Sequence, residues 1–266
     1  MSEPVLTRRA TMVGAGAAAL LAAHEVKAQA AKRKTFVLVH GAYHGGWCWR
    51  HVTEILERAG HKVYAPSLTG NGDRSHLLSK DVTLDTQIAD IVNLVTWEDL
   101  KDVCLVAHSF GGWPASGAVE RIHDRLTSVV WVDAFKPRDG EKPLDYISEF
   151  SRKALEEAVA RGETGRKAPP AKTYSLVESQ YAWIDSKLTA QPNGPTFQAL
   201  RLTGKLDTIA KKTYIRAPKY PQASFDRALA ECRADKSWQT FVAEDSGHDV
   251  MIDRPEWLAD ILLKVS

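Results

Sequence analysis

A serine on an abrupt strand-to-helix turn is the clearest chemical signal in this sequence. Residues 107–111 read Ala-His-Ser-Phe-Gly and lie between an apolar run at 103–106 and a predicted helix that extends through Glu120. Such a turn strains the backbone of its serine and exposes the hydroxyl at the carboxyl end of the sheet. It also needs small residues two places before and after, which Ala107 and Gly111 supply. We predict that Ser109 is a nucleophile; the alternative is a serine that merely caps the helix.

A serine hydroxyl needs a base to remove its proton, and a histidine near the C-terminus is placed to do so. His248 lies in the run Ser-Gly-His-Asp at residues 246–249, beyond a strand predicted at residues 240–242. It is the only histidine in the second half of the chain. We therefore predict that His248 is the base, the alternative being an ordinary surface-loop histidine.

The third member of such a triad is a carboxylate that orients the imidazole, and two aspartates compete for this role. The usual position follows the strand before the histidine strand, but residues 216–225 contain no carboxylate. Asp226 comes late, within the next predicted helix. Asp133 directly follows the predicted strand at residues 129–132. Because the carboxyl ends of parallel strands share one edge, we prefer Asp133 and keep Asp226 as the alternative.

Hydrolysis through a serine also requires backbone amides aimed at the oxyanion of the tetrahedral intermediate. We expect these amides to belong to Phe110, the residue after the nucleophile, and to Ala42, in the turn after the first strand. For the substrate pocket we predict His44, Trp47 and Trp183, with a purely structural role for Trp47 left open.

The elements that must position these residues alternate between strand and helix, which predicts an α/β fold with an open parallel sheet covered on both faces. Three predicted helices lie between these strands, and a fourth follows the last strand. The predicted strands are residues 35–39, 61–65, 103–106, 129–132, 213–215 and 240–242, and the predicted helices are residues 49–58, 83–95, 113–120 and 255–263.

A long insertion interrupts this alternation between residues 134 and about 208. It contains helix formers at residues 152–161, turn-forming prolines and dispersed aromatic residues. Insertions of this length between core strands usually serve function, so we predict a helical cap over the active site.

Composition excludes several other classes of protein. The chain has 266 residues, 35 Lys and Arg against 33 Asp and Glu, and thus a net charge of +2. So slight a balance predicts neither a nucleic-acid partner nor a membrane partner of the mature protein. The three cysteines, Cys48, Cys104 and Cys232, have no metal-binding spacing, and we predict no metal and no cofactor. Cys104 is expected to be buried and inert, whereas a Cys48–Cys232 disulfide and the oligomeric state stay open.

The N-terminal residues 1–30 have the organisation of a twin-arginine export signal. The pair Arg8-Arg9 precedes an alanine-rich apolar stretch at residues 11–23, and Ala-Gln-Ala follows at residues 28–30. We predict cleavage after Ala30, a periplasmic or secreted enzyme, and a mature hydrolase domain of residues 31–266. The alternative is an N-terminal arm that is not a signal.

Together these motifs resemble those of one branch of the α/β-hydrolase superfamily. The runs at residues 36–49 (FVLVHGAYHGGWCW), 107–112 (AHSFGG) and 247–251 (GHDVM) are similar to the plant methylesterases and hydroxynitrile lyases and to their bacterial esterase relatives. Residues 68–76 (LTGNGDRSH) resemble the bacterial members in particular. The resemblance implies broad esterase activity on small-molecule esters, including methyl esters and, in some bacterial relatives, carbamate-type bonds.

Two departures from that branch bear on function. The lyases carry a lysine directly after the catalytic histidine, where this chain has Asp249. The usual position of the triad acid is also empty. The sequence therefore favours a serine esterase that works through an acyl-enzyme. A lyase of cyanohydrins, or a non-catalytic ligand receptor on a hydrolase fold, is the alternative.

Overall fold

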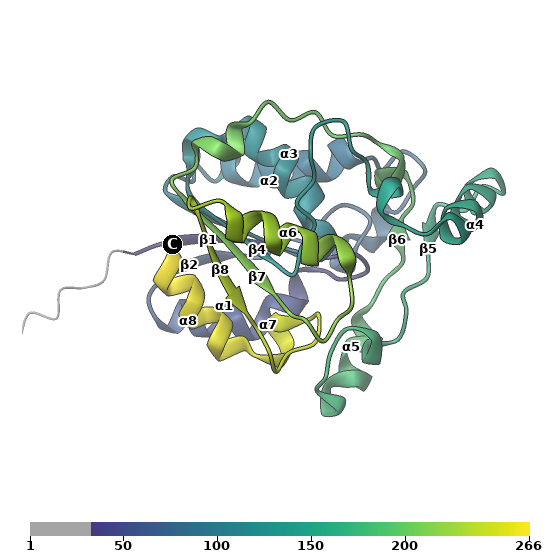
Figure 1. The fold of residues 1–266 in the computed structure, drawn as a ribbon. Coiled ribbons are helices and arrows are strands. Elements are labelled where there is room, and N and C mark those ends of the chain that lie inside the picture. Colours follow the sequence, from purple (N-terminus) through teal and green to yellow (C-terminus); the bar gives the residue numbers. More distant parts are fainter. Residues whose placement is uncertain (1–32) are drawn as a thin grey trace, which may run out of the picture. The chain divides into compact units, whose positions relative to one another are not determined.

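The structure, a computed structural model, describes residues 33–266, and their core is a six-stranded sheet (Figure 1). The strand order is β2-β1-β3-β4-β7-β8, and every neighbouring pair is parallel. The strands are β1 (Thr35–Val39), β2 (Lys62–Tyr64), β3 (Val103–His108), β4 (Leu126–Val132), β7 (Lys211–Arg216) and β8 (Trp238–Val242). The prediction of an α/β fold with an open parallel sheet is thus confirmed.

Helices cover both faces of this sheet, as Figure 1 shows. One hydrophobic cluster lies under α2, α3 and α6, and a second lies under α1, α7 and α8. The middle strand β3 is buried along its whole length, which explains its unbroken apolar sequence. The helices are α1 (Arg50–Arg58), α2 (Leu84–Trp97), α3 (Gly112–Ile122), α6 (Ala223–Ala234), α7 (Val250–Asp253) and α8 (Pro255–Val265).

The register of the central strands brings their carboxyl ends to one edge. Ala107 pairs with Val39 and with Trp131, and Val132 pairs with both His108 and Ile215. The residue that follows each strand therefore lies beside its counterparts from the neighbouring strands. This alignment gathers segments that are more than a hundred residues apart in the chain.

Residues 134–208 form the connection between β4 and β7. This segment contains two α-helices and a small antiparallel pair of strands that the sequence did not predict. Its regular elements are α4 (Glu149–Ala160), α5 (Tyr181–Lys187), β5 (Gly165–Arg166) and β6 (Gln191–Pro192). Short 3-10 helices occur at Gly46–Trp49, Gly72–Leu77, Ser109–Gly111, His123–Arg125, Pro143–Tyr146, Ala171–Thr173, Glu178–Gln180, Gly194–Phe197 and Lys205–Thr208.

The three cysteines are free and buried, so Cys48 and Cys232 form no disulfide. Cys48 and Cys232 lie in two different hydrophobic clusters. Burial raises the pKa of the Cys104 thiol to about 11, consistent with the inert thiol expected.

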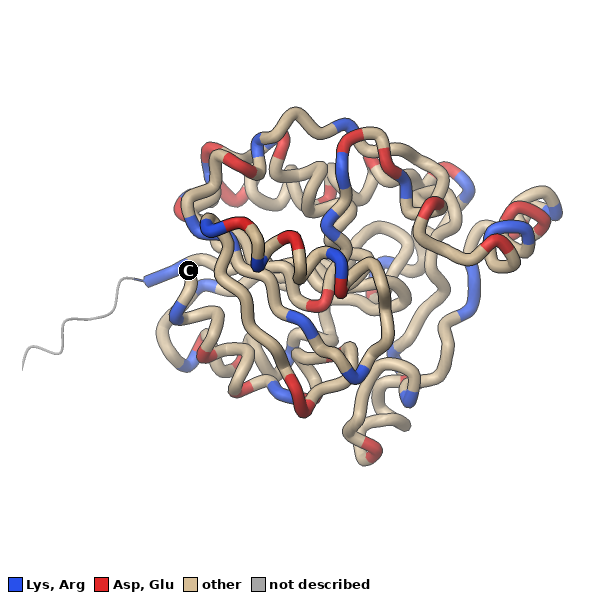
Figure 2. Tube along the Cα trace, in the orientation of Figure 1, with Lys and Arg blue, Asp and Glu red and all other residues tan. Residues whose placement is uncertain are grey.

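Charged residues of both signs are interspersed over the described part of the chain, as Figure 2 shows. Within residues 33–266 no helix is both long and apolar enough to span a membrane. The proposed export signal, residues 1–30, lies outside the described residues.

His40, directly after β1, is buried as a neutral ring. Its Nδ1–H donates to the Gly41 carbonyl at 2.7 Å, and its Nε2 accepts from the Leu68 amide at 2.9 Å. Burial lowers the pKa of His40 to about 4. Below pH 6.5 the unfolded chain binds the proton and the folded chain does not, so protonation favours unfolding.

We expect His40 to reduce the free energy of unfolding by about 2 kcal/mol between pH 7 and pH 5. In His40→Gln, which has no titrating ring, urea unfolding at the two pH values should show a drop smaller by that amount. The exposed His76→Gln is the control and should retain the full drop. An unchanged drop in His40→Gln would show that His40 is not buried in its neutral form.

Candidate active site

Ser109 occupies the sharp turn between β3 and α3. Its φ of 53° is in the left-handed region, the strained conformation that the sequence motif predicted. Two glycines make this turn possible. A Cβ on Gly111 would lie 2.5 Å from the His40 carbonyl oxygen, and one on Gly41 would lie 2.8 Å from the Ser109 Cβ. The close approach of the first-strand turn to the serine therefore requires glycine on both sides.

His248 bridges Ser109 and Asp133. Its Nε2 lies 2.7 Å from the Ser109 Oγ, and its Nδ1 lies 2.6 Å from the Asp133 Oδ2. Since a carboxylate only accepts, Nδ1 carries the hydrogen and donates to Asp133, which leaves the Nε2 of the neutral ring free to accept from the serine hydroxyl. The Tyr220 ring stacks on the imidazole with centroids 4.1 Å apart. The imidazole is thus fixed both by its hydrogen bonds and by its flat contact.

Asp133 is fully buried, and hydrogen-bond donors contact both of its carboxylate oxygens. Besides His248, it accepts from the Arg216 Nη1 at 2.7 Å and from the Ala217 amide at 2.9 Å. Asp226 instead accepts from the Nε of Arg216, and its side chain is 63% exposed. The structure therefore brings Asp133, and not Asp226, to the histidine.

Arg216 is a site residue that the sequence reasoning missed. It ends β7, and the usual position of the triad acid begins there. Its guanidinium is buried between the two aspartates, Asp133 and Asp226. The signal available was a lone arginine closing an otherwise buried strand, since such a charge needs an acidic partner.

Ala42 and Phe110, the predicted oxyanion-binding residues, both line the cavity that contains Ser109. Tyr43, the next residue after Ala42, has a φ of 68°, so the loop turns sharply there. The Tyr43 amide donates to the Gln191 Oε1 at 2.9 Å, and the Thr189 amide donates to the Tyr43 carbonyl at 2.9 Å. The insertion thus helps to hold this loop.

His44 lines the same cavity and forms a buried ion pair with Asp249. Its Nδ1 faces the Ala42 carbonyl at 2.8 Å, and its Nε2 faces the Asp249 Oδ2 at 3.1 Å. Both nitrogens face acceptors, so both carry hydrogens and the ring is charged. Burial opposes this charge, but the adjacent Asp249 carboxylate raises the pKa of His44. Although burial raises the pKa of Asp249, the histidines around it lower this pKa to about 2.

The prediction that Trp47 and Trp183 line the pocket is wrong. Neither contributes to the cavity at Ser109. Gly46, the residue before Trp47, packs against the backbone of Ala65, where a Cβ would lie 1.9 Å from the carbonyl oxygen. Trp47 instead stacks on the side of His44 and meets Trp183 edge to face at 5.2 Å. Both tryptophans therefore contact other aromatic side chains and not the wall of this cavity.

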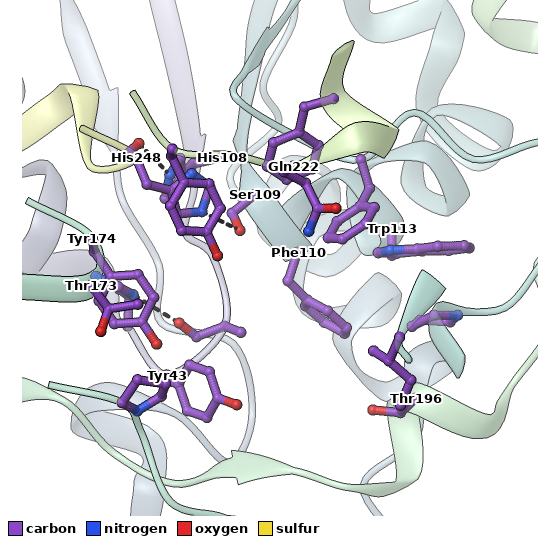
Figure 3. Close-up of a pocket in the computed structure, with 18 of the residues that line it drawn as sticks. Tyr43, His108, Ser109, Phe110, Trp113, Thr173, Tyr174, Thr196, Gln222 and His248 are labelled. Atoms are coloured by element: carbon purple, nitrogen blue, oxygen red, sulfur yellow. Dashed lines mark hydrogen bonds between the residues drawn. The ribbon is translucent and has the colours of Figure 1, made fainter. Parts of the chain in front are cut away.

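The cavity at Ser109 has a volume of about 240 Å³ (Figure 3). Residues 134–208 supply part of its wall, including Pro143, Ile147 and Thr173, which is the position predicted for a cap. Its surface is mostly apolar and has a strong aromatic component, with rings from Phe110, Trp113, Phe135, Tyr174, Tyr220 and Phe225. Within residues 33–266 no cluster of His, Cys, Asp and Glu is arranged to hold a metal ion.

The fold and the site together are those of an α/β hydrolase, and comparison with known proteins agrees. The profile of the Alpha/beta hydrolase family matches residues 36–261. A carbendazim hydrolyzing esterase of Nocardioides sp. (strain SG-4G) is 34% identical over 85% of this chain and 97% of its own length. Methylesterase 2 of Arabidopsis thaliana is 26% identical over 88% of this chain and 97% of its own length.

A solved structure leads to the same family. An extracellular alpha/beta-hydrolase from a Paenibacillus species superposes with a TM-score of 0.74 and 25% identity, covering 88% of this chain and 99% of the other. The chain therefore belongs to the α/β hydrolase family, in the neighbourhood of methylesterase-like members.

We expect Asp133→Asn to lower the turnover of a p-nitrophenyl ester by about 10³- to 10⁴-fold, because an amide cannot hold His248 in the required tautomer. The matched control is Asp226→Asn, which removes a largely exposed partner of the same arginine. Its turnover should stay within about fivefold of wild type. Comparable losses in the two variants would contradict the assignment of Asp133.

Proposed function

We propose that this enzyme hydrolyses small carboxylic esters through an acyl-enzyme formed on Ser109. The observation that carries the proposal is the unbroken chain of hydrogen bonds from Asp133 through His248 to the Ser109 hydroxyl. The family membership and the esterases among the relatives support the same reaction class.

In the first half of the reaction, the Ser109 Oγ attacks the ester carbonyl carbon while His248 takes the hydroxyl proton. The oxyanion that forms is bound by the amides of Ala42 and Phe110, and each such donor contributes about 3 kcal/mol in other serine hydrolases. The buried Asp133 carboxylate stabilises the imidazolium. His248 then gives its proton to the departing alkoxide, so the alcohol leaves and the acyl group stays on Ser109.

In the second half, water replaces the alcohol and the same groups act again. His248 removes a proton from water, whose oxygen attacks the acyl carbon. The tetrahedral intermediate collapses, and His248 returns the proton to the Ser109 Oγ. The products are the carboxylic acid and the free enzyme.

A cavity of about 240 Å³ suits small substrates, and we propose methyl esters or methyl carbamates. Two relatives bear names that fit this class, the carbendazim hydrolyzing esterase and a methylesterase. The alternative of a cyanohydrin lyase lacks the lysine after the histidine, since Asp249 stands there and is engaged by His44.

We expect Ser109→Ala to reduce hydrolysis of a panel of methyl esters, p-nitrophenyl esters and methyl carbamates by at least about 10⁴-fold. Only the nucleophile is removed, so circular dichroism and thermal unfolding should match wild type. Equal hydrolysis by Ser109→Ala and wild type would overturn the mechanism. Wild-type protein that releases cyanide from cyanohydrins but leaves all esters intact would instead be a lyase, and tight ligand binding without turnover would indicate a receptor.

We also propose that residues 1–30 are a twin-arginine export signal, which would place the mature enzyme in the periplasm or outside the cell. The support is the paired arginines, the short apolar stretch and the Ala-Gln-Ala run. The Paenibacillus relative is described as extracellular.

Export can be tested by expressing the full chain in a bacterium that has the twin-arginine pathway. The exported protein should begin at Ala31, and replacing both Arg8 and Arg9 by lysine should leave it in the cytoplasm. Exported protein that begins at Met1 would rule out the cleavage, and unchanged export of the double variant would rule out this pathway.

A further inference from the structure

The cavity at Ser109 contains a guanidinium group that the proposed mechanism does not use. Arg166 belongs to β5 and lines the cavity together with Ser109 and His248. Its backbone is held by pairing with Gln191 of β6. Arg166 is therefore part of the cavity wall, and pairing within the insertion holds its backbone in place.

All the hydrogen-bond partners found for this guanidinium are neutral. The Nε donates to the Tyr43 hydroxyl at 3.2 Å, and the Nη1 donates to the Thr196 hydroxyl at 3.1 Å and to the Asn193 Oδ1 at 3.5 Å. The guanidinium also lies over the Tyr43 ring, 5.8 Å from its centroid. Three of its five N–H donors are thus directed at neutral atoms and none at a carboxylate of the described residues.

The two aspartates next to the catalytic histidine and His44 already have partners. Asp133 is shared by His248 and Arg216, and Asp249 is paired with His44. No aspartate or glutamate lines the cavity. By contrast, the buried Arg216 has two carboxylate partners. A half-buried guanidinium in a mainly apolar cavity is incompletely solvated, so an anion entering that cavity gains a charge-assisted, two-pronged contact.

Arg166 is hydrogen-bonded to Tyr43 and Thr196, two other residues of the cavity wall. Figure 3 shows its partners Tyr43 and Thr196 on the side away from His248, with Phe110 between Ser109 and Thr196. A substrate whose carbonyl lies at the Ser109 Oγ would therefore present its distal end to Arg166. The rings of Phe110, Trp113 and Phe135 also line the cavity and suit a flat aromatic body.

We propose that Arg166 binds a free carboxylate of the substrate, so that the preferred substrates are anionic aromatic esters with this carboxylate remote from the scissile carbonyl. The kinetic test of this inference rests on the proposed ester hydrolysis, whereas the binding test does not. It makes Arg166 a specificity-determining residue, separate from the groups that carry out the reaction.

The kinetic test compares an anionic ester with a neutral ester of the same shape. The probes are monomethyl isophthalate and methyl 3-methylbenzoate, in which a methyl group replaces the carboxylate. We expect Arg166→Gln to lower kcat/KM for the anionic ester by about 10- to 100-fold, and that for the neutral ester by less than about threefold. Arg166→Lys keeps the charge but loses the planar fork, so its kcat/KM for the anionic ester should lie between those of wild type and Arg166→Gln.

The control is Lys167→Gln, which removes the adjacent exposed cation that does not line the cavity. Both esters should be hydrolysed as by wild type. If Arg166 only braces Tyr43, Arg166→Gln will slow both esters equally, and that result overturns the proposal. A wild-type enzyme that does not prefer the anionic ester over the neutral one overturns it as well.

The binding test separates this proposal from the mechanism. In the Ser109→Ala background, calorimetry should show monomethyl isophthalate binding at least about tenfold more tightly than methyl 3-methylbenzoate, with the difference abolished by Arg166→Gln. Absence of ester turnover together with this Arg166-dependent binding would reject the esterase mechanism alone. Equal binding of the two esters would reject the role of Arg166, whatever the turnover.

Discussion

The structure of the site depends on one buried carboxylate. Asp133 has no exposed surface, so its charge must be offset within the protein, and three donors converge on it: His248, Arg216 and the Ala217 amide. Two of these donors, Arg216 and the Ala217 amide, hold the carboxylate in place whether or not the imidazole is charged. The third contact fixes the imidazole so that its other nitrogen faces Ser109. The buried carboxylate of Asp133 therefore orients the His248 imidazole toward Ser109.

The parallel sheet makes this convergence possible. Ser109, Asp133 and Arg216 occur at the carboxyl ends of β3, β4 and β7, and the register of these strands sets the ends side by side. The first strand adds the turn that contains Ala42, which Gly41 allows to approach the serine closely. The segment after β8 returns His248 to the same edge. The insertion adds part of the cavity wall, including Arg166, to the catalytic groups that the core supplies.

The parts predicted from sequence are those in which local pattern and function agree. Buried strands read as continuous apolar runs, and the elbow around Ser109 demands small neighbours, so both were found without coordinates. Asp133 could be preferred over Asp226 because it directly follows a predicted strand, and the carboxyl ends of parallel strands share one edge of the sheet. The long-range pairs were not predicted: Arg216 with Asp133, and His44 with Asp249, join segments with no shared local signal. Trp47 and Trp183 were misplaced because an aromatic side chain suits a pocket and a core equally well.

In the proposed mechanism His248 activates the Ser109 hydroxyl, and the rate of reaction with a fluorophosphonate measures that activation. Mass spectrometry should find one adduct per chain, on the peptide that contains Ser109. The rate of labelling should fall by at least about 10³-fold in His248→Gln, in which Ser109 is intact but has no base. An adduct on a different serine, or an unchanged rate in His248→Gln, would show that His248 does not activate Ser109.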